Sequence, residues 1–299
     1  MDLYPINSVF PVTNAAGHCK DEAEVRRLAS STIGGIVVGS VTVKQREGNP
    51  GQTFYQEGPW TLNSIGLRNP GLGYYERVGP NMVRQSHKFG KPIIMSGAGS
   101  NPEEYVALAN SAADIGFDGF EVNVGCSNVV DGGKRHRIVS FDPRMVKYIL
   151  TDIFKLLNGD GPFVTVKVTP MTDPERIIEL ADELALYPIR AVVTMNAVPN
   201  GLLFNDRNKP AIQTPDATGW AGFSGPAVKP FALGQVNQWR RALPQGIEVW
   251  GVGGVSVGKD VHDMLRAGAS VVQVGTAYFS HSDGAKFFGG LATQFLGLA

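Results

Sequence analysis

Short apolar, β-prone runs alternate with longer segments of helical period along the chain. The apolar runs predict eight strands, at 10–15, 34–39, 92–96, 119–124, 163–168, 190–195, 248–252 and 271–275. Helical periodicity predicts helices at 21–31, 73–89, 102–115, 143–157, 174–186, 229–242, 258–267 and 283–296. Eight strand–helix repeats predict an α/β fold, a (β/α)8 TIM barrel, in preference to an open sheet.

Three of the expected helices carry start signals. Asn101, Asp142 and Asp173 each stand directly before a proline. A capping side chain ahead of a first-turn proline accepts a hydrogen bond from a free amide, and the proline presets the backbone angle. We therefore expect these residues to cap their helices.

Two connections, 40–72 and 197–228, are too long to be plain turns. Both follow strands, so both are expected as binding loops or lids over the carboxyl-terminal face of the barrel. No linker, repeat or low-complexity stretch divides the chain, and we interpret residues 1–299 as a single domain.

Composition narrows the functional class. With 27 basic and 27 acidic residues, the chain shows no charge footprint for nucleic acid or a membrane surface. Its two cysteines, Cys19 and Cys126, are too few for a disulfide framework or an iron–sulfur cluster, and we expect no metal. The start, residues 1–5, lacks the pattern of a leader, and no apolar run approaches the ~20 residues that span a bilayer. A cytoplasmic protein is expected.

Cys126 stands where a predicted strand gives way to a loop. Gly125 ends the apolar run, and Asn123 and Asn128 flank the cysteine. In a parallel α/β protein, functional side chains gather at this end of a strand. A thiol among amides is suited to abstract a proton. The alternative is a buried structural cysteine that packs as a small hydrophobe.

Glycines follow the last two predicted strands, in Gly251–Gly254 and Gly275–Thr276. Such glycines let backbone amides approach an anion, and barrels commonly bind phosphate there. A dinucleotide fingerprint is less well supported, because Ser256 replaces its third glycine and no acidic residue ends the next strand. The glycines also suit tight turns. We favour the phosphate of a mononucleotide.

Lys167 is a charged residue inside the apolar strand 163–168. Lysine is almost never fully buried without a partner, so it is expected to point to a polar ligand at the mouth of the barrel. A cation there would stabilise the negative charge of a reduced flavin. The alternative is a strand-end lysine that reaches solvent.

Taken together, these motifs resemble the dihydroorotate dehydrogenase family, most closely its soluble cytosolic class with a cysteine base. The resemblance covers nearly the whole chain. Its parts are Asn14-Ala15-Ala16-Gly17, Arg46-Glu47-Gly48-Asn49-Pro50, Asn63-Ser64-Ile65-Gly66-Leu67, Asn123 with Cys126 and Asn128, Lys167, Asn196, Gly225 with Lys229-Pro230, Gly253-Gly254 and Gly275-Thr276.

The resemblance implies FMN over the mouth of the barrel. The implied FMN-binding residues are Ala16, Gly17, Ser40, Asn63, Asn123, Lys167, Gly225, Gly253, Gly254, Gly275 and Thr276. The implied substrate-binding residues are Asn63, Gly66, Leu67, Asn123, Asn128 and Asn196, and amides suit a cyclic imide because they both donate and accept hydrogen bonds. Cys126 and Lys167 are the implied catalytic residues.

The resemblance further implies an activity. Dihydroorotate would be oxidised to orotate, as in pyrimidine biosynthesis, with Cys126 as the base and the hydride passed to the flavin. A soluble acceptor such as fumarate would reoxidise the flavin. The class also implies a homodimer.

Three positions depart from the family pattern. Gly39 replaces a lysine close to the flavin and the orotate carboxylate, Ser127 replaces a proline, and Ala197 replaces a serine. Losing a charged contact should weaken binding, since such hydrogen bonds contribute roughly 1.5–3 kcal/mol each. One hypothesis is that Arg135 or Arg137 replaces the lysine, although a charge run is ordinarily solvated.

The other hypothesis is a different cyclic amide or enone substrate. If the pose of dihydroorotate is kept, Gly39→Lys would improve its turnover. Two further classes compete: a hydrolase with Cys126 as nucleophile and His136 as its base, and a flavin-binding protein without activity.

Overall fold

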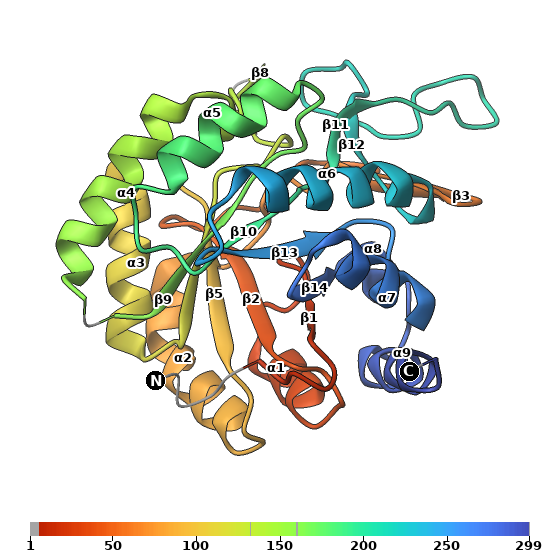
Figure 1. Ribbon diagram of the computed structural model, residues 1–299. Helices are drawn as coiled ribbons and strands as arrows, with labels where there is room; N and C mark the ends of the chain where they lie inside the picture. The colour runs from red at the N-terminus through yellow and green to blue at the C-terminus, as the bar shows by residue number, and fades with distance from the viewer. Residues whose placement is uncertain (1–5, 132, 160, 299) are drawn as a thin grey trace.

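The computed structural model describes residues 6–131, 133–159 and 161–298, and its centre is a sheet of eight parallel strands (Figure 1). In sheet order they are β1 (Val12–Asn14), β14 (Val271–Val274), β13 (Glu248–Val252), β10 (Ala191–Val193), β9 (Phe163–Lys167), β6 (Gly119–Asn123), β5 (Ile93–Gly97) and β2 (Ile36–Val41). A parallel bridge between Thr13 and Gly35 brings the two edge strands together. The fold is the expected (β/α)8 barrel.

Helices alternate with these strands and cover the outside of the barrel. They are α1 (Glu22–Ala29), α2 (Leu72–His87), α3 (Pro102–Ile115), α4 (Pro143–Leu157), α5 (Pro174–Leu184), α6 (Lys229–Ala242), α7 (Gly258–Ala267), the short α8 (Thr276–Phe279) and α9 (Gly284–Leu296), with 3-10 turns η1 (Val139–Phe141) and η2 (Pro226–Val228). Asn101, Asp142 and Asp173 accept hydrogen bonds from first-turn amides of α3, α4 and α5. The three cap predictions are confirmed, whereas α8 was not predicted.

Side chains alternate along each barrel strand between two environments. In β9, Val164 and Val166 join the apolar layer between the sheet and the helices, whereas Thr165 and Lys167 face the barrel interior. Val37, Ile94, Val193 and Trp250 belong to a separate buried apolar cluster, while Glu121, Thr165, Lys167 and Gln273 are buried polar residues. The interior therefore combines an apolar filling with polar residues that can serve a site.

The two long connections are not irregular loops. The first contains β3 (Phe54–Glu57) and β4 (Trp60–Asn63), and the second contains β11 (Val198–Gly201) and β12 (Ala221–Ser224). These pair as one antiparallel sheet in the order β11-β12-β4-β3, over a small core of Leu62, Ile212 and Ala221. No strands were predicted in these connections, because each short strand is stabilised by a partner distant in sequence.

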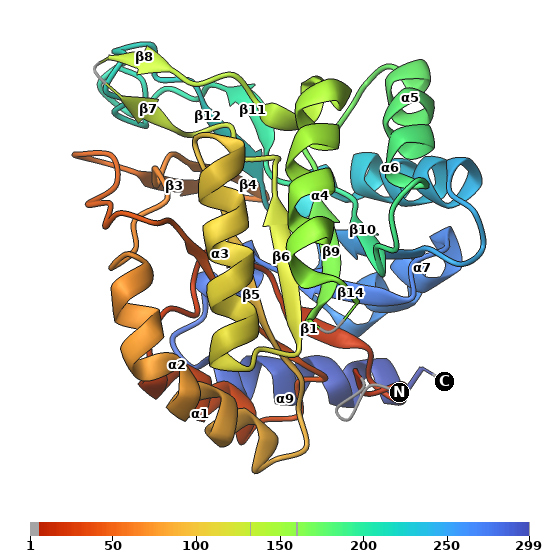
Figure 2. The same cartoon turned by 90° about the vertical axis from the view of Figure 1, so that its left-hand side faces the viewer.

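A hairpin of β7 (Val130–Asp131) and β8 (Lys134–Arg135) extends from the segment after β6. Figure 2 shows this hairpin and strands β3, β4, β11 and β12 gathered at one end of the barrel, with α9 at the other end. The added strands therefore cover the end at which the parallel strands finish, as the sequence predicts.

Residues 1–5, on which the expectation about a leader rests, lie outside the described residues. Among described helices, none has the length and hydropathy to cross a membrane.

We predict that Phe120→Ala in β6 lowers the free energy of unfolding by about 3–5 kcal/mol, because it leaves a cavity in the layer between sheet and helices. Phe120 is fully buried, whereas the control residue Phe89 is 47% exposed. Urea unfolding of Phe120→Ala and Phe89→Ala checks this. A similar small loss in both variants would contradict the packing described here.

Candidate active site

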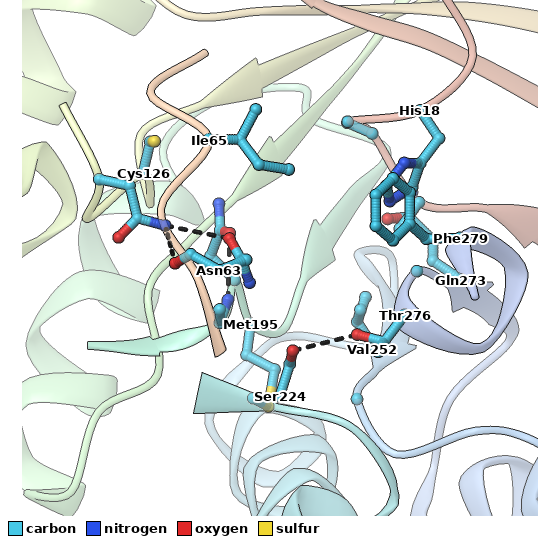
Figure 3. A pocket seen from close by; sticks show the side chains of 18 of the residues that line it. His18, Asn63, Ile65, Cys126, Met195, Ser224, Val252, Gln273, Thr276 and Phe279 are labelled. Carbon is cyan, nitrogen blue, oxygen red and sulfur yellow. Dashed lines mark hydrogen bonds between the residues drawn. The ribbon is translucent and has the colours of Figure 1, made fainter. Parts of the chain in front are cut away.

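One cavity opens at the carboxyl ends of the barrel strands, beneath the antiparallel sheet (Figure 3). Every site residue expected from the sequence lines it, although the strands and loops that supply them are far apart in the chain. These residues are Ala16, Gly17, Ser40, Asn63, Gly66, Leu67, Asn123, Cys126, Asn128, Lys167, Asn196, Gly225, Gly253, Gly254, Gly275 and Thr276. The structure brings them together; their individual roles stay predictions.

The asparagine side chains form two hydrogen-bonded groups. Asn128 Nδ2 donates to Asn63 Oδ1 over 3.1 Å, which joins the segment after β6 to the end of β4. Asn196 Nδ2 donates to Asn123 Oδ1 over 3.2 Å, and Asn123 Nδ2 donates to Ser40 Oγ over 2.9 Å. Because each amide is held by a neighbour, the cavity presents fixed donors and acceptors to a ligand.

Cys126 lies between two cavities. It lines the main cavity and also a second one of about 580 Å³, which extends toward the first turns of α3 and α4. Burial raises the pKa of the Cys126 thiol, while a hydrogen bond from the backbone N–H of Asn128 and the charge of Arg46 oppose that shift. The thiol is thus a group that becomes a base only as the pH rises.

Lys167 is buried at the bottom of the cavity, with an exposed fraction of 3%. Its Nζ donates to Gln273 Oε1 over 3.0 Å and lies 3.9 Å from Glu121 Oε1. Burial lowers the pKa of Lys167, and the charge of Glu121 opposes the shift. The lysine therefore does not reach solvent, and the strand-end alternative is wrong.

The glycine segments after β13 and β14 form another wall. Gly253 and Gly254 have φ values of 116° and 74°, and a Cβ at Gly254 would lie 2.6 Å from the Lys229 backbone. Next to Gly275, Thr276 Oγ1 donates to Ser224 Oγ over 3.1 Å. The wall therefore presents backbone and small polar groups, which suits an anion.

Several lining residues were missed by the sequence analysis. The His18 ring packs at a tilt against Phe279, with 4.2 Å between the ring centroids (Figure 3). Phe279 in turn packs edge-on against Phe54. Burial, with the charges of Lys20 and Lys167, lowers the pKa of His18 to about 3, so the ring is neutral at physiological pH. No local sequence pattern predicts that the rings of His18, Phe54 and Phe279 line the cavity together.

Glu121 and Gln273 were also missed as members of the site, although a signal existed. Both are polar residues inside apolar strands, in Phe120-Glu121-Val122 and Val272-Gln273-Val274. This is the same pattern that identified Lys167. Applied to every strand, it would have found all three.

Gly39 does not leave room for a side chain. Its φ is 114°, and an added Cβ would lie 2.5 Å from Ser96 O and 2.8 Å from Val41 N. Lysine at this position would force the backbone of β2 away from β5. These close contacts argue against the expectation that Gly39→Lys improves turnover, and that expectation stays a prediction.

Arg135 is bound away from the cavity. Its guanidinium contacts Asp216 at 3.0 Å and donates to the carbonyl oxygens of Ser127 and Trp220. Arg137 is 77% exposed and lies 3.8 Å from Asp142. Neither arginine lines the main cavity, so the hypothesis that one of them replaces a lysine there is not supported. Arg135 instead joins the Cys126 segment to the connection before β12.

Fold and site define the class: a (β/α)8-barrel enzyme whose catalytic end carries a thiol, fixed amides and a buried lysine. The family described as dihydroorotate dehydrogenase matches residues 5–288, and the chain belongs to this family. Its members are flavin-dependent oxidoreductases that act on CH–CH bonds.

Individual relatives agree with this assignment. The chain is 31% identical to a "Dihydroorotate dehydrogenase (fumarate)" of Lachancea kluyveri, over 90% of this chain and 83% of that protein. It is 32% identical to the protein of that name from Saccharomyces cerevisiae, over 93% and 86%. A structure of DHODH in complex with ferulenol from Eimeria tenella shares the fold, with a TM-score of 0.77, 17% identity and coverage of 96% and 81%.

We predict that Gly39→Lys lowers the free energy of unfolding by about 1–3 kcal/mol, because the residue must adopt an unfavourable φ beside a close carbonyl oxygen. Gly246→Lys is the matched control, since a Cβ there meets no atom within 4 Å. Urea unfolding measures both. Wild-type stability of Gly39→Lys, with faster turnover of dihydroorotate, would restore the lysine hypothesis.

We predict that Arg135→Ala loosens the segment that carries Cys126, because it removes the contacts with Ser127 and Asp216. Hydrogen exchange of amides in 125–137 should become at least about tenfold faster, which corresponds to about 1.4 kcal/mol. Arg137→Ala should leave the exchange unchanged. Equal protection in the two variants would show that Arg135 does not hold this segment.

Proposed function

We propose that this protein binds FMN and oxidises dihydroorotate to orotate, with Cys126 as the base. One observation carries the proposal: Cys126, the fixed asparagines and the buried Lys167 line the same cavity. The dihydroorotate dehydrogenases among its relatives support the substrate. A nucleophilic hydrolase would leave Lys167 and the glycine wall without a role.

The residues that line the cavity are suited to hold FMN. Gly253, Gly254, Gly275 and Thr276, with Gly225 nearby, would hold its phosphate through backbone amides and a hydroxyl. Ala16, Gly17, Ser40, Asn63 and Asn123 would contact the ring system, and Lys167 its pyrimidine edge. Gly17 supports this placement, because a Cβ built there meets no atom within 4 Å and would only fill the cavity.

The chain's own residues account for the rest of the reaction. Bound FMN supplies the acceptor for a hydride. Asn63, Asn123, Asn128 and Asn196, with the backbone of Gly66 and Leu67, would hold the substrate ring by its amide groups. Cys126 Sγ would then take the proton from the carbon next to the carbonyl. The antiparallel sheet would limit the access of water to the reacting atoms.

We also propose a soluble acceptor such as fumarate, because the relatives' names specify it. Two free cysteines suit the reducing cytoplasm.

A homodimer is proposed as well. Trp60, Trp220, Leu202 and Phe204, on or beside the antiparallel sheet, are 40–58% exposed and would be covered by a second copy.

A related substrate is the second candidate, and Gly39 favours it. No lysine fits at that position, so the carboxylate of dihydroorotate loses one expected partner. A cyclic amide or enone without that carboxylate would not need it. Both candidates use the same flavin and the same base.

Anaerobic titration of the holoenzyme with dihydroorotate separates the two candidates. We expect bleaching of the flavin absorbance by dihydroorotate. A flavin that dithionite bleaches but dihydroorotate does not would favour the second candidate. Protein that binds no FMN would contradict both.

Because the pKa of Cys126 is raised, the rate of flavin reduction should rise with pH and reach half its maximum above about pH 8.5, the value of a free thiol. Cys126→Ser should slow reduction by about 100-fold or more, since a hydroxyl is a far weaker base. Cys19→Ser is the matched control, because Cys19 is buried and lines neither cavity at Cys126. A rate that falls with pH, or Cys126→Ser with wild-type kinetics, would remove Cys126 from this role.

A further inference from the structure

A buried polar cluster crosses the barrel interior beneath the cavity. Glu121 on β6 and Gln273 on β14 lie on strands opposite each other in the sheet order. Gln273 Nε2 donates to Glu121 Oε2 over 2.9 Å, and Lys167 Nζ donates to Gln273 Oε1 over 3.0 Å. Glu121 and Gln273 are fully buried. The three side chains therefore form one connected network.

One end of this network reaches the cavity, and the other end does not. Lys167 and Gln273 line the cavity, whereas Glu121 does not. Glu121 Oε1 accepts no hydrogen bond within the described part of the chain and lies 3.9 Å from Lys167 Nζ. The ammonium thus bonds to the amide that reaches the cavity and keeps a charged neighbour behind it. Because a buried ion pair often stabilises a protein no more than apolar packing of similar volume, these charges favour a role at the cavity.

Among the described residues, two titratable groups interact with this lysine. Glu121 on β6 faces it, and His18, in the turn after β1, responds to its charge. The strand on its other side, β10, places the apolar Val193 at the paired position. His18 is neutral at physiological pH because its pKa is about 3. Glu121 is therefore the counter-charge that acts on Lys167 from the described elements around it.

We propose that Glu121 and Gln273 are positioning residues, with Glu121 keeping Lys167 charged and Gln273 directing its ammonium into the cavity toward the pyrimidine edge of FMN. This inference rests on the proposed FMN cofactor. Neither residue is required to touch the substrate. Negative charge that develops on the flavin during reduction would meet a cation already held in place.

The test is the pH dependence of FMN dissociation from the holoenzyme, which is followed by flavin fluorescence from about pH 6.5 to about pH 9.5. In Glu121→Gln, Lys167 loses its counter-charge, so its pKa should fall further and its charged fraction at the alkaline end of the range should be lower than in the wild type. Each unit by which the pKa of Lys167 falls below the assay pH reduces that fraction about tenfold. The dissociation constant for FMN should therefore rise about tenfold more than in the wild type.

Three further variants separate charge from packing. Glu121→Asp keeps the charge and should restore most of the wild-type pH profile. Gln273→Leu should weaken FMN binding at every pH without a new pH-dependent step, because Glu121 still faces Lys167. Thr165→Val is the matched control: Thr165 is fully buried, pairs with Glu121 in register, and its hydroxyl has no hydrogen-bond partner in the described structure. It should behave as the wild type.

A wild-type pH profile in Glu121→Gln would overturn the proposal, and so would the same shift in Thr165→Val. If Glu121→Gln does not fold, unchanged FMN affinity in Gln273→Leu would still contradict it. Failure of the wild-type protein to bind FMN would instead count against the proposed function. The midpoint potential of the bound flavin gives a second readout, which should fall more steeply with pH in Glu121→Gln than in the wild type.

Discussion

The chemistry at the mouth of this barrel depends on how the interior beneath it is closed. Trp250 and Val37 belong to the apolar filling of the barrel. Closer to the site, Lys167, Gln273 and Glu121 replace apolar packing with hydrogen bonds that connect opposite strands. A buried ammonium costs much free energy unless it is paired, so this network is the condition for having a fixed cation there. The Cys126 thiol and the asparagine amides share the cavity with polar groups that this network holds in place.

Local patterns in the sequence were sufficient for the barrel itself. Short apolar runs predicted every barrel strand, and period-3.6 spacing predicted the long helices around the barrel. Asn101, Asp142 and Asp173 marked helix starts. The site could be assembled for the same reason, because parallel strands all end at one rim. Residues at or just beyond the ends of separate strands, such as Asn123 and Asn196, were therefore expected to meet.

Features that depend on distant partners were not predictable. Asn63 on β4 pairs with Gly222 on β12, so neither strand is evident from its own segment. Arg135 was considered a candidate for the cavity, yet Asp216 and the Trp220 carbonyl hold it elsewhere. Gly39 was treated as an exchangeable side-chain position, but a positive φ beside the Ser96 carbonyl leaves glycine as the residue that fits. In each case the deciding contact crosses many residues of sequence.

The central claim is that one cavity holds FMN against Lys167 and the substrate against Cys126. A crystal structure of the protein with FMN and orotate tests this most directly. We expect the pyrimidine edge of the flavin at Lys167 Nζ, the phosphate at Gly253, Gly254 and Gly275, and orotate between the flavin and Cys126. Flavin density outside this cavity, or orotate on a face of the flavin that Cys126 does not reach, would contradict it.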